Sequence, residues 1–75
     1  MEKLIEKLEE LIISLKSRGN NSYVFFEKIL IKITNNNKEF IDLVSKATPI
    51  IQYGDFNYKE EKMFEEIWEM VNNLE

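Results

Sequence analysis

The side chains best suited to chemistry in this chain are carboxylates, because its 75 residues include no histidine and no cysteine. The commonest general base, the thiol nucleophile and the usual zinc ligands are therefore missing. Glu61, Glu65 and Glu69 are spaced four apart, which places them on one face of a helix. The metal site of di-iron bundles also needs Glu-x-x-His motifs, which this chain cannot supply. We therefore expect no metal at these three glutamates.

A second carboxylate pattern begins at Asp55 and imitates part of a calcium-binding loop. Asp55, Asn57 and Glu66 stand at the first, third and twelfth positions of an EF-hand. However, Lys59 occupies the fifth position, which should be a ligand, and Glu60 stands where glycine must make the turn. Asn57 followed by Glu60 fits the N-cap of a helix instead. We expect neither a metal nor a cofactor.

Signatures of catalysis on phosphates and of nucleic-acid binding are also missing. The two glycines, Gly19 and Gly54, cannot form a glycine-rich phosphate loop. The segments that could form a helix-turn-helix contain no arginine to read guanine. The net charge of −4 lies entirely in residues 58–75, where six acidic residues accompany two lysines, and a nucleic-acid binder needs a basic face. We expect the protein not to be an enzyme and not to bind nucleic acid.

The strongest helical pattern is that of residues 58–74. At 100° per residue, its apolar side chains fall on one side of a helix. They are Phe64, Ile67, Trp68, Val71 and Leu74, and Met63 and Met70 widen this side into a broad arc. An arc of that width can contact two helices at once, so we expect residues 58–74 to form the central helix of a small helical core.

A first helix is predicted over residues 2–18. Its leucines follow a four-three-four spacing that makes an apolar stripe: Leu4, Leu8, Leu11 and Leu15. Gly19 follows the stripe and can take the left-handed conformation that ends many helices. We expect this helix to end there.

A second helix is predicted over residues 22–34, although its β-branched residues alternate in a way that also fits a strand. We prefer a helix because no second strand is apparent to pair with it. Val24 and Ile31 lie on the face opposite its core side chains. Either this helix is packed between two neighbours, or Val24 and Ile31, with Ile13 of the first helix, form an exposed contact surface.

A third helix is predicted over residues 37–47. Asn36 followed by Glu39 resembles a capping box at its start. Pro49 places its end before residue 48, because the residue preceding a proline avoids the helical conformation.

The connection between the third and last helices, residues 48–57, is unusually apolar for a surface loop. It contains Ile50, Ile51, Tyr53 and Phe56. One interpretation is that these side chains fold onto the end of the bundle and close its core. The other is that Tyr53, Phe56 and Tyr58 form an aromatic surface for a partner protein.

Together these patterns predict an all-α fold, a small compact bundle of four helices (about 2–18, 22–34, 37–47 and 58–74) with an apolar loop, 48–57. We expect one domain, residues 1–75, because a chain of this length can build only one core. No segment approaches the roughly 20 apolar residues that cross a bilayer, and the first ten residues lack the apolar core of a signal peptide. We therefore expect no membrane partner and a cytoplasmic location; the residue usage suggests a bacterial or phage origin.

The function that these observations favour is non-enzymatic binding of another protein. The candidate partner surface combines the aromatic connection with the acidic face of the last helix: Tyr53, Asp55, Phe56, Tyr58, Glu61, Glu65 and Glu69. In size, acidity and helical layout the chain resembles, in outline, small regulatory proteins such as immunity proteins, although no motif carries this resemblance. The alternative is a structural protein that forms a homodimer through Ile13, Val24 and Ile31.

Overall fold

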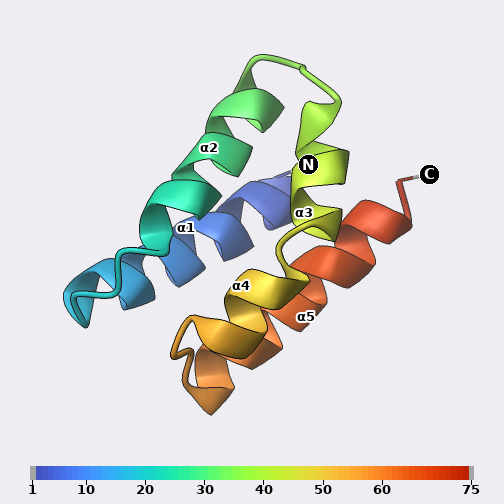
Figure 1. Ribbon diagram of the computed structural model, residues 1–75. Helices are drawn as coiled ribbons and strands as arrows, with labels where there is room; N and C mark the ends of the chain where they lie inside the picture. Colours follow the sequence, from blue (N-terminus) through green and yellow to red (C-terminus); the bar gives the residue numbers. More distant parts are fainter. Residues whose placement is uncertain (1, 75) are drawn as a thin grey trace.

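The structure, a computed structural model, describes residues 2–74, and over that range its secondary structure is helical with short connections (Figure 1). The five helices are α1 (Glu2–Ser17), α2 (Tyr23–Thr34), α3 (Glu39–Ser45), α4 (Thr48–Tyr53) and α5 (Tyr58–Asn72). The radius of gyration is 11.2 Å, close to the roughly 11 Å expected of a compact chain of this length. The predicted all-α bundle is confirmed, and residues 22–34 form a helix rather than a strand.

Helix α1 lies between α2 and α5 and contributes the largest share of the buried apolar side chains (Figure 1). Helix α3 contacts both α2 and α5 and so closes the core. The core residues are Leu4, Leu8, Leu11, Ile12, Leu15, Phe26, Ile29, Ile33, Phe40, Val44, Ala47, Phe64, Ile67 and Val71. Helix α5 contacts two helices, α1 and α3, as its wide apolar arc predicts, but the central position belongs to α1.

The apolar arc of α5 is only partly covered. Phe64, Ile67 and Val71 are buried, whereas Trp68 is 44% exposed. Leu74 is also half exposed, because it lies beyond the end of α5 at Asn72. The buried stripe therefore follows the middle of the arc, and Trp68 stands on its edge.

Helices α1 and α2 each end in a Schellman motif, with a left-handed residue two positions past the helix. After α1, Gly19 has φ 74°, and the N–H of Asn20 donates to the carbonyl of Leu15 at 2.9 Å, as predicted for Gly19. After α2, Asn36 has φ 56°, and the N–H of Asn37 donates to the carbonyl of Lys32 at 2.9 Å. The prediction that Asn36 caps the start of the third helix is wrong, because asparagine tolerates the left-handed conformation and Asn36 ends α2 instead. Helix α3 accordingly begins only at Glu39.

The predicted loop 48–57 is wrong for its first six residues, which form α4. Pro49 lies in the first turn of α4, where its missing N–H removes no intrahelical hydrogen bond. The proline therefore separates two helices, since α3 ends at Ser45 and α4 begins at Thr48. Gly54 follows α4 with φ −93°, and a Cβ there would overlap the carbonyl oxygen of Ile50.

None of the helices within residues 2–74 combines the length and the apolar character that crossing a membrane requires.

Replacing either glycine should destabilise the fold, but for different reasons. Gly19→Ala places a Cβ in the left-handed region, where we expect a loss of about 1 kcal/mol, or roughly 4–8 °C in Tm. Gly54→Ala places a Cβ against the Ile50 carbonyl and should also lower Tm, although its φ is ordinary. Thermal unfolding followed by circular dichroism measures both changes.

Asparagine substitutions separate the two causes. Gly19→Asn should recover much of the loss because asparagine tolerates positive φ, and nothing lies within 4 Å of the added Cβ. Gly54→Asn should recover nothing, since its Cβ meets the same carbonyl. Equal recovery at both positions would show that these assignments are wrong.

Candidate functional site

A groove with a volume of about 230 Å³ lies between α4 and α5. We call it the α4–α5 groove; it is lined by Thr48, Ile51 and Gln52 of α4 and by Glu61, Phe64, Glu65 and Trp68 of α5. Phe64 is buried, and Ile51 is partly buried against the core, so the base of the groove is apolar and fixed. Apolar walls with few polar groups are typical of binding sites on proteins.

Helix geometry explains why the α5 residues of the groove lie together. Glu61, Glu65 and Trp68 follow one another at spacings of four and three, so they form a row along one edge of the helix. Helix α4 lies beside this edge but has only six residues, none of them buried. Trp68 lines the groove with α4 residues but is only partly covered.

The rim of the groove is acidic. Glu61 has no ion-pair partner within residues 2–74. The carboxylate of Glu65 lies 4.0 Å from the ammonium of Lys62, and both side chains are exposed, so this pair contributes little. Glu69 lies outside the groove, in a neighbouring hollow that also contains Glu65 and Glu66. The groove thus combines an apolar base with uncompensated negative charge.

The residues predicted to form the partner surface are divided by the structure. Glu61 and Glu65 line the groove, whereas Tyr53 (86% exposed) and Tyr58 (74% exposed) stand in solvent outside its lining. Phe56 is partly buried, with its ring centroid 5.9 Å from that of Phe26. Phe56 therefore packs on the core, as the first interpretation of residues 48–57 states, and Tyr53 is exposed.

The groove residues that sequence reasoning missed are Ile51, Phe64 and Trp68 as lining groups. The helical pattern placed Phe64 and Trp68 on the apolar side of the last helix, but it gave no sign that Trp68 would stay uncovered. The one feature of the sequence that could have suggested this exposure is the position of Trp68 at the edge of the apolar arc, next to Glu61 and Glu65. A side chain at the edge of an apolar arc can be covered by a neighbouring helix or left exposed, and the length of α4 decides between the two.

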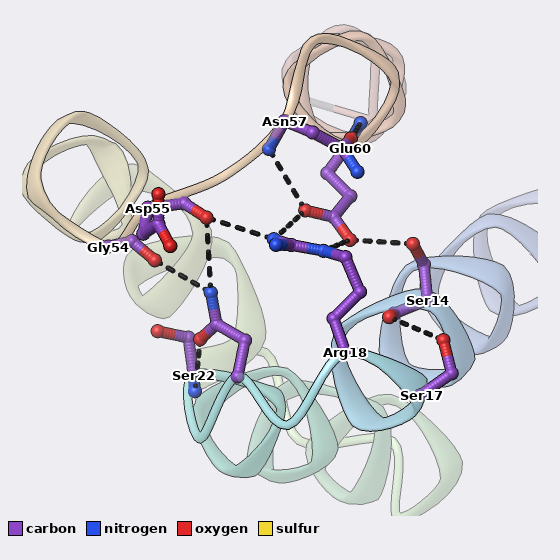
Figure 2. A network of polar contacts seen from close by, with 9 residues as sticks. Ser14, Ser17, Arg18, Ser22, Gly54, Asp55, Asn57 and Glu60 are labelled. Atoms are coloured by element: carbon purple, nitrogen blue, oxygen red, sulfur yellow. Dashed lines mark hydrogen bonds and ion pairs between the residues drawn. The ribbon is translucent and has the colours of Figure 1, made fainter.

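An ion pair around a buried carboxylate, which the sequence reasoning also missed, fixes this region (Figure 2). The side chain of Glu60 is fully buried, and Arg18 donates to both of its carboxylate oxygens, from Nε to Oε2 at 3.0 Å and from Nη2 to Oε1 at 2.6 Å. The hydroxyl of Ser14 donates to Oε2 at 2.6 Å, and the N–H of Asn57 donates to Oε1 at 3.0 Å. We call Ser14, Arg18, Asn57 and Glu60 the Glu60 network.

Part of the Glu60 network was predictable. The side chain of Asn57 accepts from the N–H of Glu60 at 2.8 Å, which completes the predicted capping box at the start of α5. The partner of Glu60 was not predicted, although Arg18 is the only arginine among ten basic residues. Arginine is the cation best suited to a bidentate, buried pair with a carboxylate, which is a signal that could have been used.

The same residues hold the chain between α4 and α5. Arg18 Nη2 also donates to the carbonyl of Asp55 at 2.9 Å, and the side chain of Asn20 donates to the carbonyl of Gly54 at 2.7 Å (Figure 2). The end of α1 therefore fixes where α4 ends and where α5 begins. Because Glu60 is buried and its oxygens already accept several hydrogen bonds, its carboxylate is structural and not placed to reach a substrate.

The pKa of Glu60 reflects two opposing effects. Burial raises the pKa, but the hydrogen bonds from Arg18, Ser14 and the Asn57 N–H, together with the charge of Arg18, lower it below its ordinary value of 4.5. Because the folded protein holds the carboxylate in its charged form, the network contributes stability above pH about 4.5. This contribution is lost as the pH falls through the lowered pKa of the folded state.

No group of three or more acidic side chains within residues 2–74 is arranged to hold a metal ion. The carboxylates of α5 are instead spread over three environments. Glu60 is buried against Arg18, Glu66 pairs with Lys7 at 2.9 Å, and Glu61 faces the groove.

The residues predicted for self-association are exposed. Val24 is 45% and Ile31 57% exposed on the outer face of α2, so the interpretation that α2 is packed between two neighbours is wrong for residues 2–74. Ile13 is 66% exposed on α1 and lines a hollow with Met63 of α5.

Glu60→Gln should destabilise the protein far more than the same change at an exposed pair. The variant keeps the shape of the side chain but removes the charge that Arg18 binds, so we expect a loss of about 1.5–3 kcal/mol at neutral pH. Urea unfolding at pH 7 and at about pH 3 measures the change. The difference from the unsubstituted protein should shrink at the lower pH, because the Glu60 carboxylate then binds a proton in the unfolded chain, which favours unfolding.

Glu66→Gln is the matched control, because Glu66 lies on the same helix and pairs with Lys7 but has a half-exposed carboxylate. It should change the free energy of unfolding by at most about 1 kcal/mol. Equal losses for the two variants would mean that the Glu60 network does not stabilise the fold.

Comparison with known proteins gives no match: no protein-family model, no curated protein and no solved structure matches this chain. The function is therefore argued from the geometry of the site.

Proposed function

We propose that this protein is a non-enzymatic module that binds another protein at the α4–α5 groove. The observation that carries the proposal is Trp68, whose side chain is 44% exposed above an apolar base. In a chain of 75 residues the core is small, so burying a large aromatic side chain would add to its stability, and leaving Trp68 outside the core gives up that contribution. Tryptophan is enriched among the residues that dominate binding energy at protein interfaces.

The size of the groove supports a protein partner over a cofactor. Sites for small molecules and cofactors usually enclose about 300–1,000 Å³. The α4–α5 groove, at about 230 Å³, is smaller and open on one side to solvent. It suits one or two side chains that project from the surface of a partner.

The charge of the groove supports a basic partner. Glu61 and Glu65 stand at its rim, and the whole chain carries a net charge of −4. Such a field speeds the encounter with a positively charged protein. A small acidic protein that regulates or neutralises a basic partner by covering it, in the manner of an immunity protein in the bacterial or phage cytoplasm, is the form of this function that we favour.

Truncating Trp68 should remove the partner without unfolding the protein. We expect Trp68→Ala to weaken binding by about 2 kcal/mol or more, roughly thirtyfold in Kd, while helicity by circular dichroism stays unchanged. The measurement is quantitative mass spectrometry of proteins retained from an extract of the source cells by immobilised protein and by the variant. A binding protein should be retained by the first and lost with the second.

Tyr58→Ala is the matched control, since Tyr58 is an exposed aromatic residue of the same helix outside the groove. It should retain the partner. Loss of the partner with Tyr58→Ala but not with Trp68→Ala would place the site on the tyrosines and refute the groove. The groove would also be refuted if Trp68→Ala retained the same proteins as the unsubstituted protein.

Homodimer formation is a second candidate function, favoured by Val24 and Ile31 on the outer face of α2. These side chains are one heptad apart on a face that α1 and α3 leave free. Pairing that face with a second copy would add apolar burial to a small core.

If the α2 face forms a homodimer, Val24→Lys combined with Ile31→Lys should convert a dimer into a monomer, because two like charges would then meet their own copies across the interface. Light scattering coupled to size exclusion, at several loading concentrations, measures the mass. Ile13→Lys tests whether α1 takes part. An unsubstituted protein that is already a monomer at high concentration would rule out this function.

A further inference from the structure

The α4–α5 groove places an aromatic ring and two carboxylates beside one another on α5. Glu61, Glu65 and Trp68 all line it, and their spacing keeps them in one row along the helix. The face of an indole ring attracts a cation, and carboxylates accept the strong hydrogen bonds that a guanidinium or an ammonium donates. The row therefore offers both kinds of contact that a long cationic side chain makes.

No cation of the described chain occupies this position. The only arginine, Arg18, is committed to Glu60. Lys62 lies over the ring of Tyr58, with Nζ 5.7 Å from its centroid, and reaches Glu65 only at 4.0 Å. Lys59 lines the hollow on the α1 side of α5. Within residues 2–74 the charge of Glu61 is therefore left for an external partner.

We infer that the partner inserts an arginine side chain into the α4–α5 groove, with its guanidinium between Glu61 and Glu65 and its stem against Trp68 and Ile51. This inference rests on the proposed function, because it names the chemistry of the partner at the same site. The apolar base accommodates the methylene groups of the stem, and the acidic rim accommodates the charge.

Arginine fits this site better than lysine does. Its planar guanidinium carries donors in a fork that can reach two carboxylates at once, stacks on aromatic rings and is less strongly hydrated than an ammonium group. The chain itself shows the same preference at Glu60, where its single arginine makes the bidentate pair.

The test is a selection of short random peptides that bind the immobilised protein. Peptides that also bind the Trp68→Ala variant are discarded. Recovered peptides should share an arginine. One synthetic peptide is then titrated against the protein by fluorescence, since Trp68 is the only tryptophan of the chain. Replacing its arginine by citrulline, a neutral isostere, should weaken binding about tenfold or more.

Variants of the rim show whether the arginine meets the predicted carboxylates. Glu61→Gln combined with Glu65→Gln should weaken binding of the arginine peptide by the same factor as the citrulline replacement does. In this double variant the arginine and citrulline peptides should bind with equal affinity. Glu69→Gln, on the same helix but outside the groove, should bind the peptide as the unsubstituted protein does.

The outcomes separate this inference from the proposal beneath it. Peptides that depend on Trp68 but contain no arginine, and that bind the Glu61 and Glu65 double variant equally well, would overturn the arginine and leave the groove as the binding site. Failure to recover any peptide that depends on Trp68 would overturn both.

Discussion

The pairing of Arg18 with Glu60 is the interaction on which the arrangement of α4 beside α5 depends. Leaving the buried carboxylate of Glu60 without its cationic partner is unfavourable, so Arg18 and Glu60 hold each other in place. They belong to the end of α1 and the start of α5, and Arg18 also binds the carbonyl of Asp55 in the intervening connection. Helix α4 has no buried residue of its own, so its position depends on these polar contacts at its end and on the partial packing of Ile51 and Phe56.

This constraint divides the molecule into two parts with different sources of order. Helices α1, α2, α3 and the buried stripe of α5 are ordered by the packing of their buried apolar side chains. The region around α4 is ordered by hydrogen bonds to backbone carbonyls and to Glu60. Apolar surface can therefore stay exposed at the α4–α5 groove without disturbing the core.

The parts of the fold that follow from local patterns could be predicted from the sequence. The leucine stripe of α1, the left-handed Gly19 and the capping box of Asn57 with Glu60 each depend on residues within one or two helical turns. Asn36 was misassigned because asparagine can start a helix or end one. Pro49 correctly marked the end of the third helix, but proline can also begin a helix, and the start of α4 was missed. The pair of Arg18 with Glu60 joins residues 42 apart, and no periodic pattern encodes such a contact. For the candidate site, Glu61 and Glu65 could be named from their spacing, but the exposure of Trp68 could not.

That exposure follows from the lengths of two helices. Helix α4 has six residues and extends about 9 Å, whereas α5 has 15 residues and extends about 22 Å. Arg18 and Asn20 hold the end of α4 near the start of α5. Helix α4 therefore lies beside the first turns of α5. Trp68 lies about 15 Å along α5 from Tyr58, a greater distance than the length of α4, and it is 44% exposed. The acidic residues Glu61 and Glu65 lie nearer the start of α5 along the same edge, so the fold that exposes the ring also sets negative charge beside it. The place that the Glu60 network gives α4 therefore leaves an aromatic ring exposed beside two carboxylates, and the proposed cationic partner is inferred from this arrangement.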